Sequence, residues 1–284
     1  MHALNKSHIW ITAIIFSFGC GNAAEPIKQL PNYNLEKPEK FIMPETLLEI
    51  SGISFKNGLN DTIYAIQDEE GKLFRLAWGV KKQYHTKFGK KGDYEDVSIL
   101  NNQAIILKSN GSLFTFPITD AVYEEIDSAQ EWKHLLPDGE YEAMFGDEAS
   151  KKLYIVCKNC EADNNKDHVS GYILQVTDSI RKVGEFGLDV EQIKPFTGKV
   201  KGGFRPSAIS KNPVTNEWFI LSAVNKLLVI ADASWKIKEA YALNGNLFSQ
   251  AEGITFDKEG NLYISNEGDD LKDGNILKFT RLAK

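Results

Sequence analysis

The chain of 284 residues is poor in several features whose scarcity narrows its function. It has 33 Lys and Arg against 39 Asp and Glu, so it lacks the positive charge that drives binding to a phosphate backbone. It has 5 His and no Gly-x-Ser-x-Gly motif. No apolar run reaches the roughly 20 residues that a membrane-spanning helix needs. These absences argue against a nucleic-acid partner, a serine-hydrolase triad and a membrane helix.

The N-terminus carries the features of an export signal. Lys6 precedes an apolar run at residues 9–19, which is too short to span a bilayer and is typical of a signal peptide. The run ends at Gly19-Cys20-Gly21, which resembles the lipobox of bacterial lipoproteins, in which the Cys is acylated. We predict a signal peptide over residues 1–19, a lipid on Cys20 and a linker over residues 20–40. Ordinary cleavage near Ala23-Ala24 is the alternative, and it would discard Cys20.

Cysteine is scarce, and acylation of Cys20 leaves only Cys157 and Cys160. No second Cys pair and no nearby pair of His residues completes a zinc site. The pair follows a β-rich run rather than opening a helix, unlike a thioredoxin motif. In an oxidising compartment we predict a Cys157–Cys160 disulfide. Free thiols, or redox or metal chemistry, are the alternatives.

Helical periodicity is also scarce, whereas short β-rich runs separated by Gly, Asn and Asp recur throughout, which predicts an all-β fold. Five copies of a short motif each lead into a strand, and further apolar strands follow each copy. The equivalent residue of each copy is Ser51, Glu95, Glu142, Ser207 and Glu252. These residues are 44, 47, 65 and 45 positions apart.

A repeat of about 45 residues with three or four strands has the length of one β-propeller blade. We predict a five-bladed propeller over residues 41–284. The longer third step is interpreted as a blade with insertions at residues 161–170 and 199–203, and a hidden sixth blade is the alternative. The last repeat has room for only three strands. An N-terminal strand around residues 40–43 is therefore predicted to supply its fourth and to close the ring.

Four motifs resemble the SdiA-regulated family of bacterial exported proteins. They are Glu49–Ile53, Asp68–Leu73, Gly92–Val97 and Gln250–Ile254, and the resemblance extends from about residue 44 to residue 280. The resemblance implies a five-bladed propeller, distantly similar to NHL-repeat proteins, with a calcium site. It implies no catalytic activity.

Equivalent positions on the blades of a propeller lie on a ring about its axis. The five repeat residues are thus expected to converge at one mouth of the channel, where three carboxylates without a counter-charge would repel one another. A hard cation such as Ca²⁺ relieves that repulsion. Asp68 and Glu267, at matching ends of second strands, are expected to extend the same rim. The alternative is that each Glu caps its own blade or pairs with a neighbouring Lys or Arg.

We expect an exported, monomeric binding module, held to a bacterial membrane at the cell envelope by its lipid alone. It would present a calcium-bearing mouth to a small molecule or an envelope protein, without chemistry of its own. The alternative is a calcium-dependent phosphoesterase or esterase of the propeller-phytase type. That enzyme would need a cationic cluster to hold phosphate, and Lys108, Lys158 and Arg205 fall in or beside the same ring.

Overall fold

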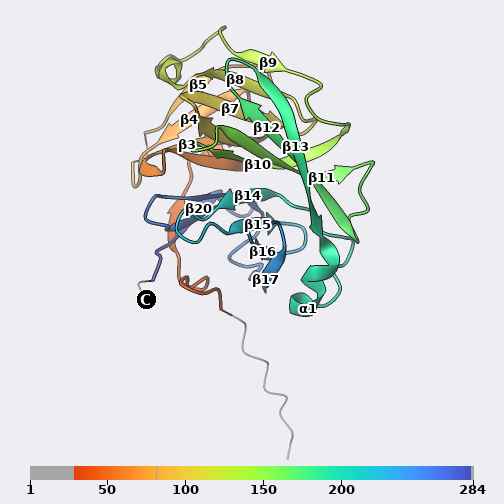
Figure 1. Cartoon of the computed structure of the whole chain (residues 1–284). Helices are drawn as coiled ribbons and strands as arrows, with labels where there is room; N and C mark the ends of the chain where they lie inside the picture. Colours follow the sequence, from red (N-terminus) through yellow and green to blue (C-terminus); the bar gives the residue numbers. More distant parts are fainter. Residues whose placement is uncertain (1–28, 81, 283–284) are drawn as a thin grey trace, which may run out of the picture.

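The computed structural model describes residues 29–80 and 82–282, which form five four-stranded antiparallel sheets with very little helix (Figure 1). Blade 1 contains β2 (Ile50–Lys56), β3 (Leu59–Gln67), β4 (Lys72–Leu76) and β5 (Tyr84–Lys87). Blade 2 contains β6 (Tyr94–Leu100), β7 (Gln103–Lys108), β8 (Leu113–Pro117) and β9 (Gln130–Trp132). Blade 3 contains β10 (Gly139–Asp147), β11 (Lys152–Cys160), β12 (His168–Val176) and β13 (Ile180–Asp189). Blade 4 contains β14 (Ala208–Lys211), β15 (Trp218–Ser222), β16 (Leu227–Ala231) and β17 (Ile237–Ala242). Blade 5 contains β18 (Ala251–Phe256), β19 (Leu262–Asn266), β20 (Asn275–Phe279) and β1 (Glu39–Ile42).

The five sheets are the blades of a closed propeller, as the repeats predict. The inner strands β2, β6, β10, β14 and β18 contact one another in sequence, and β18 also contacts β2. Each pair of successive blades encloses one buried apolar cluster, including the pair formed by blades 5 and 1. The core is therefore a ring of five interfaces, and the inner strands surround a central channel.

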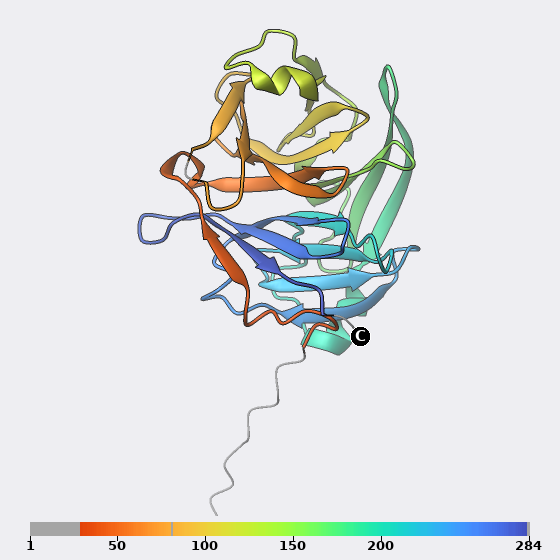
Figure 2. The ribbon, with the colours of Figure 1, turned by 90° about the vertical axis from the view of Figure 1, so that its left-hand side faces the viewer.

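The ring is closed by the N-terminal strand that the sequence predicts. Strand β1 pairs antiparallel with β20, from Glu39 opposite Lys278 to Ile42 opposite Asn275. In Figure 2 this red-orange strand runs beside the blue C-terminal blade. Tyr33, which precedes the expected domain start at residue 41, is buried between blades 4 and 5 and donates a hydrogen bond to the Gly260 carbonyl at 2.6 Å.

The long third step between repeats holds insertions and not a sixth blade, because no additional sheet occurs within residues 29–80 and 82–282. Blade 3 has long strands, and after β13 the chain forms a 3₁₀ turn at Val190–Ile193 and the short helix α1 (Lys194–Thr197). Further 3₁₀ turns occur at Glu45–Leu47 and Ile118–Val122. No helix in the described ranges has both the length and the apolar character needed to cross a membrane. The predicted export signal and Cys20 lie outside those ranges.

Candidate functional site

Four of the five repeat residues lie at irregularities of their inner strands. Glu95 of β6 has no paired residue on β7, because the register shifts between Tyr94 and Asp96. Glu142 of β10 likewise has no paired residue on β11. Glu252 of β18 and Ser51 of β2 are also left without a partner. A bulge leaves one residue out of the ladder and re-aims its side chain. Bulges at equivalent places on four blades thus direct these side chains to the same end of the channel.

That end of the channel is an acidic cavity of about 260 Å³. Its lining comes from blades 1, 2, 3 and 5 and consists of Ser51, Asp68, Asp93, Glu95, Glu140, Glu142, Lys158, Glu252 and Glu267. Seven of these nine residues carry a carboxyl group and one carries a positive charge. We call this group the acidic mouth. Seven of its members were predicted from the sequence, six as oxygen ligands and Lys158 as part of a cationic cluster.

Asp68 and Glu267 lie together, as the circular arrangement of blades 1 and 5 predicts. Their carboxylate oxygens and one from Glu49 all lie within 4.8 Å of one another. Glu49, Asp93 and Glu140 were not predicted as site residues. The last two stand two positions before a repeat glutamate, which places them on the same side of an extended strand. This spacing is the signal that could have identified them.

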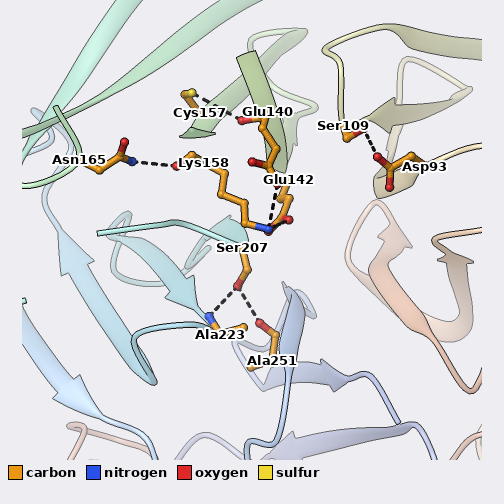
Figure 3. A network of polar contacts seen from close by, with 10 residues as sticks. All are labelled: Asp93, Ser109, Glu140, Glu142, Cys157, Lys158, Asn165, Ser207, Ala223 and Ala251. Atoms are coloured by element: carbon orange, nitrogen blue, oxygen red, sulfur yellow. Dashed lines mark hydrogen bonds and ion pairs between the residues drawn. The ribbon is translucent and has the colours of Figure 1, made fainter. Parts of the chain in front are cut away.

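Ser207 does not line the acidic mouth. Its hydroxyl donates a hydrogen bond to the Ala251 carbonyl at 2.7 Å and accepts one from the Ala223 backbone N–H at 3.2 Å (Figure 3). Ser207 precedes the inner strand of blade 4, whereas Ala251 begins that of blade 5. Its side chain therefore joins two blades, and blade 4 contributes no residue to the acidic cavity.

The three cations proposed to bind an anion are not brought together. Lys158 reaches into the acidic mouth, where its ammonium contacts Glu142 and lies 3.3 Å from a Glu140 carboxylate oxygen (Figure 3). Lys108 instead lies over the Tyr94 ring, at 5.5 Å from the ring centroid, and neither it nor the exposed Arg205 lines the cavity. Among the described residues, the acidic mouth therefore contains one positively charged side chain, and that side chain already pairs with Glu142 and Glu140.

Lys158 is fixed on both sides by its neighbours. Cys157 and Cys160 form a disulfide that brackets it, and both half-cystines are buried. The Asn165 side-chain amide donates a hydrogen bond to the Lys158 carbonyl at 2.8 Å. Burial lowers the pKa of Lys158, but its contacts with Glu142 and Glu140 outweigh burial and leave the pKa raised. Lys158 is therefore a fixed positive charge in the mouth.

Four carboxyl groups of the acidic mouth have a pKa well above the ordinary range. Burial raises the pKa of Glu95 to about 9, helped by the nearby charges of Glu142 and Asp93. Burial, with Glu142 and Glu267 nearby, raises the pKa of Glu252 to about 8. The same combination of burial and neighbouring acids raises the pKa of Glu267 to about 7 and that of Asp68 to about 6. Without a cation, the site is neutralised in part by protons.

Two carboxylate oxygens in the acidic mouth are buried without a hydrogen-bond partner in the described part of the chain. They are Oδ1 of Asp68 and Oε2 of Glu142, and Glu142 as a residue is only 7% exposed. Buried acceptors are normally satisfied, so each such atom indicates a missing donor or ion. Oxygen donors from several strands around a small cavity suit a hard cation. The acidic mouth therefore fits a bound metal ion.

Comparison with family models finds one match over part of the chain. Residues 205–270 match the SdiA-regulated family. The match spans blade 4 and the first two strands of blade 5, includes Ser207 and Glu252, and confirms the resemblance found in the sequence. No curated protein is significantly similar in sequence.

Solved structures with this fold share little sequence with the chain. A luciferin-regenerating enzyme has a TM-score of 0.54 at 10% identity, over 87% of this chain and 96% of its own. A calcium-binding protein, regucalcin from Agrobacterium tumefaciens strain C58, has a TM-score of 0.51 at 13% identity, over 89% of this chain and 96% of its own. At such identities the likeness establishes the fold alone.

Proposed function

We propose that the protein is an exported, lipid-anchored β-propeller that binds calcium at its acidic mouth and presents that mouth to a small molecule or an envelope protein. The observation that carries the proposal is the convergence of seven carboxyl groups from four blades on one cavity. Two of their buried oxygens have no hydrogen-bond partner among the described residues. Export and anchoring rest on the sequence of residues 1–21.

Calcium suits the acidic mouth better than magnesium does. Ca²⁺ accepts six to eight oxygens in flexible arrangements, whereas Mg²⁺ requires a compact octahedron and keeps several waters. Asp68, Glu142, Glu252 and Glu267 are the residues that would hold the ion, with Glu95 beside them. Bound there, calcium would neutralise the carboxylates and offer a coordination position to an oxygen atom of a ligand. The structural neighbour from Agrobacterium, itself described as calcium-binding, supports this choice.

A binding module is better supported than a phosphoesterase. Phosphate transfer beside calcium needs positive side chains that hold the phosphate oxygens. Only Lys158 of the three proposed cations lines the cavity, and it is paired with Glu142 and Glu140. The described residues therefore supply no free cationic cluster next to the acidic mouth.

Calcium titration by calorimetry tests the proposal. The protein is expected to bind Ca²⁺ in the micromolar range, as calcium-sensing sites do. The variant Glu95→Gln/Glu142→Gln/Glu252→Gln should lose that binding, because it removes three negative charges while keeping side-chain size. A control variant, Glu124→Gln/Glu161→Gln/Glu259→Gln, removes three exposed acids outside the cavity and should bind normally. Absence of binding by the unaltered protein, or equal loss in both variants, would refute a calcium site in the acidic mouth.

Ser207 is expected to be structural although it occupies the repeat column. Ser207→Ala leaves the buried Ala251 carbonyl and Ala223 N–H without their partner, so the free energy of unfolding should fall by about 1–2 kcal/mol. Calcium affinity should stay unchanged because the side chain lies outside the cavity. Urea denaturation and calorimetry measure the two quantities, with exposed Ser179→Ala as the control. A large loss of affinity would instead assign Ser207 to the calcium site.

A further inference from the structure

The opposite end of the channel holds a second cavity, of about 250 Å³. Three positions beyond the repeat column, four inner strands carry a hydroxyl: Ser54 of β2, Ser98 of β6, Ser210 of β14 and Thr255 of β18. All four line this cavity, and the equivalent residue of blade 3 is Phe145. The hydroxyls therefore come from four blades and face one small space, which we call the hydroxyl mouth.

These four residues are largely buried, but their hydroxyl oxygens stay open to the cavity. Ser54 and Thr255 are each 9% exposed, Ser98 is 5% exposed and Ser210 is 2% exposed. Within residues 29–80 and 82–282, none of the four side chains forms a hydrogen bond. None of the four oxygens is among the fully buried polar atoms without a partner, so each is accessible from the cavity. Four unpaired hydroxyls that face one small cavity are available to form hydrogen bonds with a molecule that enters it.

Much of the remaining lining of the hydroxyl mouth is apolar. Five aliphatic side chains, one from each inner strand, line it: Ile53, Val97, Met144, Ile209 and Ile254. Phe55, Phe145 and Phe256 also line it. A mostly apolar cavity with a few convergent polar groups is the usual form of a small-molecule site. The two cavities share no lining residue, so this site is independent of the calcium proposal.

The charges around the hydroxyl mouth favour a neutral ligand. Lys211 and Lys258 line it, and so do Glu148 and Asp257, so neither sign prevails. Asp257 already accepts hydrogen bonds from Asn60, Asn261 and Tyr263. A hydroxyl group both donates and accepts, so ligand hydroxyls can satisfy all four protein hydroxyls. The apolar walls suit the carbon faces of a ring, and the volume limits the ligand to about one six-membered ring.

We infer that the hydroxyl mouth binds a small neutral polyol, such as a monosaccharide or a cyclitol. Saturation-transfer NMR tests this with D-glucose, D-galactose, D-mannose and myo-inositol as probes. The protein is kept in EDTA so that calcium at the acidic mouth plays no part. At least one probe should bind at millimolar concentration, as expected for so small a ligand. Absence of binding by all four at about 20 mM would overturn the inference and leave the cavity to water.

The variant Ser54→Ala/Ser98→Ala/Ser210→Ala/Thr255→Val locates the binding, because it removes the four hydroxyls with little change in shape. Its affinity for the probe that binds should be lower by about tenfold or more. A control with exposed hydroxyls removed, Ser128→Ala/Thr177→Val/Ser179→Ala/Ser234→Ala, should bind as the unaltered protein does. If the fourfold variant fails to fold, Ser98→Ala and Thr255→Val are tested singly. Undiminished binding by the folded variants would overturn the inference.

Discussion

Replacing Lys158 with methionine is expected to raise the affinity for calcium by about tenfold or more and to destabilise the calcium-free protein. The Lys158 ammonium occupies the acidic mouth and contacts Glu142, so it competes with a metal ion for the same oxygens. Methionine keeps the length of the side chain and removes its charge. In the variant, one positive charge that repels calcium is removed, and the Glu142 carboxylate is free to bind the ion.

The same change costs stability when calcium is absent. Removing one partner of a buried ion pair leaves the other charge uncompensated, which is strongly unfavourable. Glu142 is 7% exposed, and protonation can relieve only part of the cost. We expect the free energy of unfolding to fall by ~2 kcal/mol at pH 8, a value reduced because Lys158 keeps some exposure. Saturating calcium should restore this loss through its binding free energy.

Lys108→Met is the matched control for this prediction. Lys108 also lies in the second strand of its blade, blade 2, but it lies over the Tyr94 ring and outside the cavity. The control should leave calcium affinity unchanged. Calorimetry in calcium and urea denaturation with and without calcium measure both effects. Equal calcium affinities for Lys158→Met and the unaltered protein would show that Lys158 does not compete with the metal.

The repeat column could be predicted because a propeller converts sequence period into angular position. Glu95, Glu142 and Glu252 occur at the same place in three repeats, so closing the ring brings them to one cavity whatever their local contacts. The same reasoning predicted that Asp68 and Glu267 are neighbours, although 199 positions separate them in the chain. Long-range contacts of this kind follow from the topology of the propeller, which is why the sequence was sufficient to predict them.

Local geometry could not be predicted in the same way. Ser207 stands in the repeat column, but its strand β14 begins one residue later and shows no bulge, so its hydroxyl bonds to backbone atoms instead of the cavity. Lys108, Lys158 and Arg205 fall in or beside the same ring in the sequence, but only the Lys158 side chain reaches the cavity. The course of the Lys158 side chain depends on a flanking disulfide and a hydrogen bond from Asn165, which repeat spacing does not encode.

Raising the pH from 5 to 9 is expected to destabilise the calcium-free protein and to affect the calcium-loaded protein much less. Burial and neighbouring acids raise the pKa of Asp68, Glu267, Glu252 and Glu95 to about 6, 7, 8 and 9, whereas unfolded carboxyl groups titrate near 4. Between these values the folded state binds more protons than the unfolded state. Stability must therefore fall as the pH rises.

The stabilising contribution of these groups is fully present below about pH 4 and is lost as the pH rises through 6 to 9. Crediting only Glu95 and Glu252, each with a single tenfold difference in proton affinity, gives a loss of ~3 kcal/mol. The loss of stability is larger if the whole pKa difference between the folded and unfolded states applies to both residues. The positive charges of Lys158 and Lys226 lower the pKa of Glu252 and so limit its share. Urea denaturation at pH 5, 7 and 9, in EGTA and in calcium, measures it.

Calcium changes this dependence because it takes the place of the protons. A metal ion stabilises the ionised carboxylates, so calcium affinity should rise with pH as protons cease to compete, and the loaded protein should keep its stability at pH 9. The variant Glu95→Gln/Glu142→Gln/Glu252→Gln is the control: it removes two of the four acids with raised pKa values, and also the charge of Glu142, which helps to raise the pKa of Glu267. Its stability should therefore depend less on pH than that of the unaltered protein in EGTA. Parallel curves for the unaltered protein with and without calcium would mean that the raised pKa values and the metal do not belong to one site.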